Sequence, residues 1–441
     1  MFLKNIFSYT SCMNYKDHML FPLFASMLLT SHLLCADTLY DQNITKTKTK
    51  DWTVLPYAFS SDTTGLAGGL SILMSGVFQP QTSFVATVFR GESQEVIIDG
   101  EQRERSFKGG FFYFSDYKLP YTDRTFFSVY GLKSYFPKSK YYLDGSNNSN
   151  KNDVFLSSGE SNFLNMKFEY ILPIGSGLEN PQGLCQVENG FVVCKRSKGG
   201  GKPFVTGQTS IGIKTFYQTD TLDHIKDLPD WSTNGLRFHI THDNTDFDTN
   251  PSRGYHFQMQ YSKDFGKGDS TQSWDFLEFK YNQYYSLDTF SFTKQNVLAL
   301  SLWTGYSFSW NDNENIIGSH RPPVWEGARL GGFNRMRGYD NNRFSDKAVF
   351  YATAEYRAIL DYNPFKGSDL VPAKVDWFQV VAFAEVGRVH NHYNFDLLND
   401  MKYDVGLSLR ALVEEIPVRI DVGYGEEGAN MWVMVQQPFD F

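Results

Sequence analysis

The feature that most constrains this sequence is an alternation of apolar and polar residues with a period of two. It is clearest in four segments, at positions 164–172, 255–262, 403–410 and 418–424. One face of each segment is aromatic and aliphatic, and the other carries charged groups, amides or glycine. Successive side chains of a strand point to opposite faces, so this pattern predicts β-strands.

Soluble β-sandwiches also alternate, so further features must separate them from membrane barrels. Many segments exceed ten residues, which is long enough to cross a bilayer at a tilt. Aromatic residues, 17% of the chain, crowd the apolar face near segment ends, as in the interfacial girdles of membrane barrels. Because every backbone group must be paired inside a membrane, a closed barrel is the architecture that strands can use there.

The sequence therefore predicts an all-β fold, a transmembrane antiparallel β-barrel of 16 strands. An even count puts both termini on the periplasmic side, with 136–160 and 307–347 as long external loops and 173–203 as an unusually long periplasmic connection. The predicted strands lie at 52–60, 66–77, 82–90, 105–115, 124–135, 161–172, 204–218, 234–242, 254–263, 272–287, 290–306, 348–360, 375–388, 402–413, 416–424 and 431–441.

Composition excludes two other classes. A hydrophobic share of 41% is too high for a disordered chain, and a net charge of −8 argues against nucleic acid as a partner. We find neither a G-x-S-x-G elbow nor an H-E-x-x-H motif, and we therefore expect no enzyme activity, no cofactor and no metal.

The N-terminus has the order of a secretory signal. Lys4 and Lys16 precede an apolar stretch at 19–34, which small residues around Ala36 follow. Basic, apolar and small residues in that order predict a signal peptide over 1–36. A membrane anchor or a lipidated Cys35 fits this stretch less well.

Two cysteines remain after that cleavage. Cys185 and Cys194 lie in the turn-rich part of the 173–203 connection. Cysteines of an exported chain can pair in an oxidising compartment, so we predict a local disulfide that closes a hairpin. A metal site is disfavoured because the neighbouring sequence offers no histidine or further cysteine.

The last predicted strand carries an aromatic ending. Met431, Val433, Val435, Phe439 and Phe441 share one face of it. A terminal aromatic strand is the kind of address that barrel-assembly machinery recognises. We therefore predict an assembly signal at Phe439 and Phe441, with that machinery and the outer-membrane bilayer as partners.

Two stretches carry a family resemblance. One is 321–344, which contains L-G-G and R-G-Y, and the other is 242–255, H-D-N-T-D-F-D-T-N-P-S-R-G-Y. Together they resemble the bacterial surface antigen family of outer-membrane barrels, which includes the barrel-assembly insertase BamA, TamA-like proteins and two-partner secretion transporters. The likeness extends to 380–389 and 406–424.

The resemblance implies a loop folded into the barrel lumen. In that family the arginine of R-G-Y pairs with acidic groups on the inner wall, and here it is Arg337, followed by Gly338 and Tyr339. The matching acidic residues are Glu355 and Glu385. A guanidinium in a narrow lumen needs a carboxylate, which its planar fork can bind through two hydrogen bonds.

Glycines suit this inward loop. Gly331, Gly332 and Gly338 let the chain turn tightly and pass close to the wall. The alternative is an exposed glycine-rich loop with Arg337 in solvent.

The second stretch predicts a strand connection. Asp243, Asp246 and Asp248 supply side chains that favour turns, and Pro251 and Gly254 follow them. A calcium loop is the alternative, but the spacing is not that of an EF-hand and no bidentate glutamate follows.

Function rests on the resemblance. The segment 37–51 is a short polar tail before the barrel at 52–441, where insertase and transporter relatives carry POTRA domains. The resemblance implies insertion or translocation of proteins or lipids through a lateral seam, with a separate periplasmic protein as a candidate partner. There are two alternatives to insertion or translocation. One is a passive channel, and the other is a surface antigen with 136–160 and 307–320 as contact loops.

Overall fold

The computed structural model describes residues 51–61, 65–98, 101–183, 187–192, 200, 206–223, 230–312, 315–365, 374–413, 416–435 and 437–439. Outside these residues lie the predicted signal peptide at 1–36, the predicted tail at 37–51 except for its last residue, Asp51, and also Cys185, Cys194 and Phe441. The predictions made for them stay predictions.

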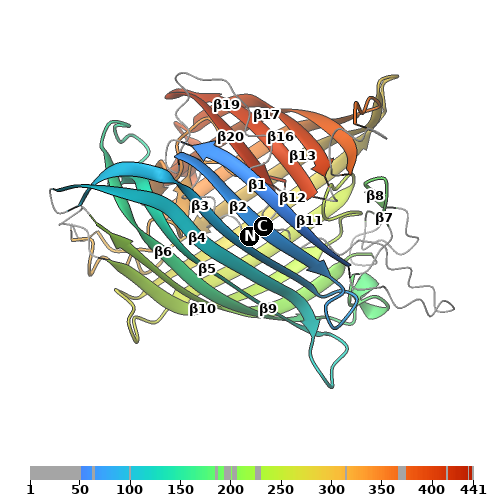
Figure 1. Ribbon diagram of the computed structural model, residues 1–441, viewed down its shortest axis with the longest axis horizontal. Coiled ribbons are helices and arrows are strands. Elements are labelled where there is room, and N and C mark those ends of the chain that lie inside the picture. The colour runs from blue at the N-terminus through green and yellow to red at the C-terminus, as the bar shows by residue number, and fades with distance from the viewer. Residues whose placement is uncertain are drawn as a thin grey trace.

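The described chain forms one antiparallel sheet of sixteen strands, which curls round on itself (Figure 1). The sixteen strands predicted from the alternation are all present. In sheet order they are β1 (Asp51–Ser61), β2 (Gly65–Ser75), β3 (Ser83–Ile98), β4 (Glu101–Lys118), β5 (Thr125–Tyr142), β6 (Val154–Ile171), β9 (Gln208–Leu222), β10 (Trp231–Asp243), β11 (Gly254–Asp264), β12 (Trp274–Leu287), β13 (Thr293–Tyr306), β16 (Ala348–Leu360), β17 (Val375–His390), β18 (Lys402–Val413), β19 (Ile416–Gly425) and β20 (Gly428–Val435).

The predicted loop at 136–160 is too long. The ladder between β5 and β6 continues to the pair Tyr142 and Val154, so the connection is only 143–153. Its register shifts between Phe136 and Ser139, where Pro137 lies. Proline cannot donate a ladder hydrogen bond, so the strand bulges at Pro137 and then resumes.

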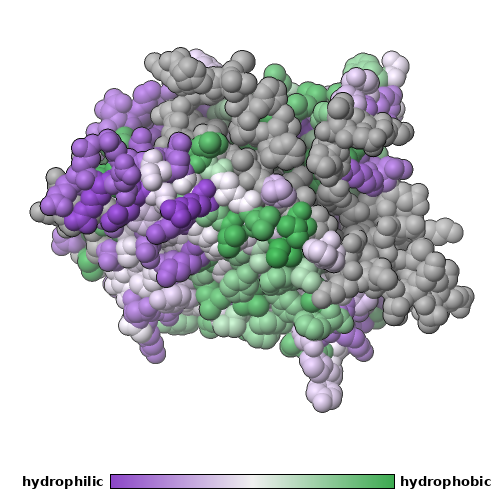
Figure 2. Space-filling view, in the orientation of Figure 1, coloured by the Kyte–Doolittle hydropathy of each residue, from purple (hydrophilic) through white to green (hydrophobic). Residues whose placement is uncertain are grey.

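The apolar face of the strands points outward. Leu407 and Tyr424 are 63% and 65% exposed, whereas Glu355 and Arg410, on the opposite face of the sheet, are 0% exposed. Figure 2 shows hydrophobic residues gathered over the middle of the viewed face and hydrophilic residues gathered toward its left end. An apolar outer band suits hydrocarbon, and the charged inner face is covered by other parts of the chain. No helix within the described part of the chain is long and apolar enough to span a membrane.

The two edge strands lack a common ladder. Hydrogen-bonded ladders join every neighbouring pair from β1 to β20, but none joins β1 to β20 within residues 51–61 and 428–435. Side chains from both ends of the sheet nevertheless share one hydrophobic cluster, which contains Ala67 of β2 and Trp432 of β20. The sheet thus brings its two ends to a common core inside the barrel.

Both termini of the sheet lie at one end of the barrel, because sixteen antiparallel strands return the chain to the side on which β1 began. We call this end the terminal mouth. The long connection between β6 and β9 lies there and holds a short helical turn, η2 (Gly175–Leu178), and a hairpin of β7 (Val187–Glu188) and β8 (Phe191–Val192).

Candidate functional site in the barrel lumen

The connection from β13 to β16 fills part of the lumen. Residues 307–347 contain a small ladder between β14 (Ala328–Leu330) and β15 (Phe344–Asp346). Met336 and Tyr339 at its tip are both 0% exposed and belong to a cluster with Trp303 and Val349 of the wall. The loop therefore packs against the inner face of the barrel, as the inward-folded loop of the sequence prediction requires.

Glycines shape the turn into the tip. Gly331 and Gly332 have φ angles of +99° and +114°, which residues with a Cβ rarely adopt. A Cβ on Gly331 would lie 2.2 Å from the Asp340 carbonyl oxygen, and one on Gly332 would lie 2.4 Å from Asn341 Oδ1. Gly331 therefore excludes larger residues by conformation and by space, and Gly332 excludes them by conformation.

Arg337 lies at the tip of the loop, with three carboxylates around its guanidinium. Its Nη2 is 2.8 Å from Glu355 Oε1 on β16, and its Nε is 3.2 Å from Glu385 Oε2 on β17. Its Nη1 is 3.6 Å from Asp421 Oδ2 on β19. The guanidinium also lies over the Phe383 ring, 3.5 Å from its centre. One side chain thus joins the loop to three strands.

The backbone on either side of Arg337 strengthens this attachment. The Arg337 N–H donates to Glu385, and the Gly338 N–H donates to Asp404 Oδ2 at 3.0 Å. Trp432 Nε1 donates to the Arg337 carbonyl at 2.7 Å, which brings in β20. A Cβ on Gly338 would lie 2.7 Å from the Asp404 Cβ, so only glycine lets the backbone approach the wall this closely.

Tyr339 completes the motif. Its hydroxyl donates to the Tyr403 carbonyl at 3.1 Å and accepts from the Glu426 N–H at 3.3 Å. Its ring packs edge-on against Phe344 of the same loop. The R-G-Y motif therefore contacts each of the strands from β16 to β20. It also contacts the turn between β19 and β20.

The wall around Arg337 is a network of buried ionisable groups. Four buried arginines and four buried carboxylates take part, namely Arg337, Arg357, Arg410, Arg419, Glu355, Glu385, Asp404 and Asp421. Arg357 and Arg410 both bind Glu355, at 2.8 and 2.9 Å. Buried charges are tolerated when they are paired and hydrogen-bonded.

The acidic groups also keep Arg337 charged. Burial by itself would lower the pKa of Arg337, but Glu385 and Glu355 outweigh it and raise that pKa above its usual range. The loop therefore carries a permanent cation at its tip.

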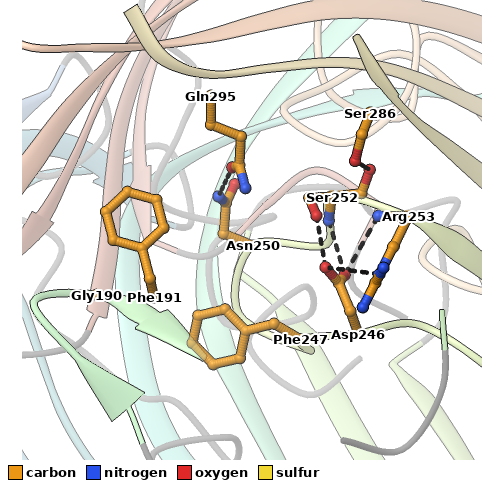
Figure 3. Close-up of a pocket in the computed structure, with 9 residues that line it drawn as sticks. All are labelled: Gly190, Phe191, Asp246, Phe247, Asn250, Ser252, Arg253, Ser286 and Gln295. Carbon is orange, nitrogen blue, oxygen red and sulfur yellow. Dashed lines mark hydrogen bonds and ion pairs between the residues drawn. The ribbon is translucent and has the colours of Figure 1, made fainter. Parts of the chain in front are cut away.

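The motif at 242–255 forms the turn from β10 to β11 at the terminal mouth (Figure 3). Asp246 Oδ1 accepts the backbone N–H groups of Ser252 and Arg253, at 2.8 and 3.2 Å. Asp243 Oδ1 similarly accepts the Thr245 N–H at 3.0 Å. The Asp243 bond is that of an Asx turn, and the Asp246 bonds close the wider turn across six and seven residues, so both carboxylates satisfy backbone groups without a metal ion.

The remaining motif residues fit the same turn. A Cβ on Gly254, whose φ is +92°, would lie 1.9 Å from the Asn244 carbonyl oxygen. Pro251 is buried, and Asp248 is half-buried within the turn. Within the described residues, no group of three His, Cys, Asp or Glu side chains is placed to hold a metal ion.

The turn is not the simple connection that the sequence predicts, because Asn250 reaches into the barrel. Its Nδ2 donates to Gln295 Oε1 on β13 at 3.0 Å, and its Oδ1 accepts from Gln379 Nε2 on β17 at 3.1 Å. Gln437, beyond β20, also donates to Asn250 Oδ1, at 3.4 Å. The sequence carries no signal for this role, which depends on which strands lie opposite one another.

The predicted final strand at 431–441 is wrong in its extent. β20 ends at Val435, and the chain then turns into the lumen. Phe439, 2% exposed, packs with Tyr284, Val297 and Ala299, and its carbonyl accepts from Asn282 Nδ2 at 3.1 Å. Pro438 breaks the row of ladder donors, and the barrel interior offers the aromatic ring an apolar pocket. Phe439 therefore does not share a strand face with Met431.

The β7–β8 hairpin meets this region from the other side. Its turn at Asn189 and Gly190 has positive φ at both residues, as in a type I′ hairpin. Trp377 Nε1 of β17 donates to the Gly190 carbonyl at 3.2 Å, and Phe191 packs against the cluster that includes Leu412. The hairpin leaves the sheet between β6 and β9, so it crosses the terminal mouth to reach β17 and β18.

Comparison with known proteins then identifies the family. The model described as the Omp85 superfamily domain matches residues 89–431. This chain belongs to the Omp85 superfamily. The superfamily is one of outer-membrane β-barrels and matches the resemblance found in the two sequence stretches.

A solved structure agrees at the level of the fold. CdiB from Escherichia coli is 10% identical to this Omp85 chain, covers 87% of it and has a TM-score of 0.53, and the match spans 61% of CdiB. BamA from Haemophilus ducreyi lacking POTRA domains 1-3 is also 10% identical, with 88% and 69% coverage and a TM-score of 0.47. No functionally curated protein matches the sequence.

Proposed function

We propose that this Omp85 barrel resides in the outer membrane and inserts or translocates proteins, or lipids, through a lateral seam between β1 and β20. The loop carrying Arg337 stays in the lumen, and the role is not enzymatic. The absence of a ladder between β1 and β20 in their described residues carries the proposal. Unpaired edges can accept a strand from a client.

Features of both edge strands support the seam. β1 contains Pro56, and proline, which cannot donate a ladder hydrogen bond, is favoured on edge strands and otherwise tolerated at bulges and strand starts. β20 pairs with β19 over only eight residues, from Gly428 to Val435. A short edge strand is easier to part from a neighbour than one of the longer strands in the same sheet.

Occupation of the lumen supports a lateral path over an axial one. Residues 307–347 dock on the wall through Arg337, while the β7–β8 hairpin and Phe439 occupy the terminal mouth. A polypeptide moving along the barrel axis would have to displace all of these segments. A path between β1 and β20 leaves all of these segments in place. It affects the loop only through the hydrogen bond from Trp432 of β20 to the Arg337 carbonyl.

A seam lock tests the proposal. Val54→Cys is combined in turn with Met431→Cys and Val433→Cys in a chain carrying Cys185→Ser and Cys194→Ser, and each pair is joined by oxidation or a short bismaleimide. The measurement is the rate at which a urea-unfolded small outer-membrane barrel inserts into vesicles that contain the refolded protein. We expect locking to reduce this rate to that of empty vesicles, and reduction of the disulfide to restore it.

A matched control adds the same bond elsewhere. Ile72 of β2 and Ala86 of β3 are already ladder partners, so Ile72→Cys with Ala86→Cys links two strands that do not need to part. This variant should insert the client at the wild-type rate. An unchanged rate in the locked seam variant would contradict the proposal.

A further inference from the structure

Three exposed cations lie side by side on β3, β4 and β5, namely Arg90, Lys108 and Lys133. Arg90 and Lys108 are direct ladder partners. Lys133 pairs with Gly110, two residues from Lys108 on β4. Side chains in such direct and diagonal positions on one face of a sheet are near neighbours. The three cations therefore form one group, which we call the outer basic cluster.

The alternation of the strands places this cluster on the outside of the barrel. Val88, two residues before Arg90 on β3, is 62% exposed and pairs with Gly110. On the opposite face of the same two strands, the rings of Phe89 and Phe107 are buried and stack at 4.7 Å. Because successive side chains of a strand point to opposite faces, the outer basic cluster points outward with Val88.

The cluster lies where the apolar outer band ends. Along β3, away from the terminal mouth, the outward residue changes from Val88 to Arg90. The same change occurs on β6, from Leu164 to Asn162, and Asn162 is the ladder partner of Lys133. Figure 2 shows such a boundary on the viewed face, where hydrophobic residues give way to hydrophilic ones away from the terminal mouth. Lipid headgroups lie immediately beyond the hydrocarbon, so the cluster is at headgroup level.

The cations of the outer basic cluster are not neutralised within the described part of the chain, where their side chains form neither an ion pair nor a hydrogen bond. Two nearby carboxylates have other partners. Glu92 accepts the Leu66 N–H at 3.0 Å, and Glu160 of β6 accepts from Asn162 Nδ2 at 3.5 Å. Like charges directly opposite each other on a sheet are destabilising, so the cluster lowers stability unless an anion from outside neutralises it.

Cations elsewhere at this end of the barrel are paired. Lys263 of β11 lies 3.5 Å from Asp275 Oδ2 on the neighbouring strand. Lys402 of β18 lies 2.9 Å from Glu426 Oε2 in the turn after β19. The outer basic cluster differs from these pairs because three cations adjoin one another and their ladder partners supply no carboxylate.

We propose that the outer basic cluster binds the phosphate groups of anionic lipids, in the leaflet farther from the terminal mouth. Arginine binds phosphate oxygens through two parallel hydrogen bonds, and lysine adds a point charge. A lipid suits the position because the cluster adjoins exposed Val88 and Phe112, along which acyl chains can lie. Gly110, the ladder partner of Val88 and Lys133, has no side chain to separate the cations from this apolar surface.

The bound lipid fixes the depth of the β3–β5 wall in the membrane. This inference rests on the membrane residence in the proposed function, but it does not depend on the seam or on any client. Basic residues beside a membrane surface attract anionic headgroups, and the attraction increases with the number of cations. A cluster of three therefore favours anionic over zwitterionic lipids at this place on the barrel.

The test titrates phosphatidylglycerol into the mature chain refolded in a neutral detergent, with native mass spectrometry to measure binding of the first lipid. Wild type should bind phosphatidylglycerol more tightly than phosphatidylcholine. Lys108→Gln should weaken binding about fivefold, and a triple variant with Arg90→Gln and Lys133→Gln on the order of a hundredfold. The matched control is Lys263→Gln, which removes an outward cation that is already paired and should bind as wild type.

A second measurement reports on the cluster itself. Lysines are acylated by an amine-reactive ester in vesicles of phosphatidylcholine with and without phosphatidylglycerol, and each site is quantified by peptide mass spectrometry. Phosphatidylglycerol should protect Lys108 and Lys133 severalfold and leave Lys263 unchanged. Equal protection of all three lysines, equal weakening by Lys263→Gln, or wild-type binding by the triple variant would overturn the proposal.

Stability in detergent separates a lipid site from a structural role. Without anionic lipid, the triple variant should unfold on heat-modifiable gels at the wild-type temperature or above it, because like charges have been removed. A lower temperature would mean that the cations stabilise the barrel by themselves, and would overturn the proposal.

Two further arms identify the source of the phosphate and test membrane residence. Inorganic phosphate, at the concentration of the lipid phosphate, should not protect Lys108, and equal protection would assign the cluster to a soluble anion and overturn the lipid. Wild type should refold in phosphatidylcholine vesicles before any anionic lipid is added. Failure to do so would overturn membrane residence as well, whereas failure of lipid binding by a refolded barrel would overturn this inference alone.

Discussion

Arg337 is the residue on which the lumen loop depends most. Its side chain and the backbone beside it contact Glu355, Glu385, Asp404 and Asp421, which lie on four successive strands. Burying such charges gains little net stability over an apolar core, but removing one partner leaves the others uncompensated. A substitution of Arg337 should therefore destabilise the attachment of the loop to all four of these strands.

We expect Arg337→Ala to destabilise the folded barrel by about 3–5 kcal/mol, because it leaves buried carboxylates without their cation. Arg337→Lys should recover only part of that loss, since an ammonium cannot span the three carboxylates as a guanidinium does. The measurement is the urea midpoint of tryptophan fluorescence. Arg253→Ala, at a side chain 61% exposed, should leave the midpoint unchanged, and a wild-type midpoint for Arg337→Ala would refute the argument.

Gly331 offers a second test at this scale. Gly331→Ala should cost more than the roughly 1–3 kcal/mol of backbone strain expected at a positive φ, because the new Cβ also meets the Asp340 carbonyl. Gly428 has a φ of +125°, and a Cβ added there would have no neighbouring atom within 4 Å, so Gly428→Ala reports the strain alone. Equal urea midpoints for the two variants would show that the close approach at Gly331 does not matter.

Only part of the network around Arg337 could be predicted from the sequence. Arg337, Glu355 and Glu385 stand in family motifs, so the resemblance points to them. Alternation could assign Asp404 and Asp421 to the inner face, but it could not bring them to Arg337. That proximity depends on the register between strands and on the path of the loop, neither of which is written in a local pattern.

At the scale of elements, alternation located every strand but not every strand end. Hydrophobic pattern decides which face is buried, whereas the end of a strand depends on ladder pairing. Pro137 therefore marks a bulge within β5, and Pro438 lies beyond the true end of β20. Both prolines interrupt an alternating pattern, but their outcomes differ. After Pro137, β5 pairs with β6 again, whereas Pro438 comes after the last residue of β20.

The hairpin of β7 and β8 supports the cysteine prediction. Cys185 and Cys194 lie equally far in sequence from its central residues, Asn189 and Gly190. We expect the two thiols to be oxidised to a disulfide in the exported protein. The measurement is the intact mass, which should be about 2 Da, the mass of two hydrogen atoms, below that of the reduced chain. Free thiols that react with maleimide in the unreduced, unfolded protein would contradict this expectation.

At the scale of the molecule, the lumen is obstructed at two levels. The loop at 307–347 docks within the barrel, and the hairpin, the β10–β11 turn and the chain after β20 meet at the terminal mouth. A passive channel of sixteen strands would instead need a clear axis. The structure thus makes conductance a direct test of the passive-channel alternative.

We expect wild type to conduct poorly in planar bilayers and deletion of 321–344 to raise single-channel conductance severalfold, because it removes the loop from the lumen. Deletion of 392–398, in the connection from β17 to β18, where Tyr393 contacts Thr304 and Tyr306 of β13, is the matched control and should leave conductance unchanged. A large steady conductance in wild type, or no increase on deletion of 321–344, would favour a loop that does not close the barrel.

Phe439 can be tested apart from assembly. Phe439→Ala should destabilise the refolded barrel by about 3–5 kcal/mol, since it empties a buried aromatic site against Tyr284. Refolding in detergent needs no assembly machinery, so a lower urea midpoint there reports packing. A defect confined to cells would instead support the predicted assembly signal and count against a packing role.

The buried position of Phe439 also implies an order of events. Its carbonyl bonds to Asn282, 157 residues earlier in the chain, and contacts between such distant residues form late because the intervening chain must first be arranged. An aromatic end cannot be held by assembly machinery and by this pocket at once. We therefore expect docking of Phe439 to coincide with release of the finished barrel, so that its burial marks completion.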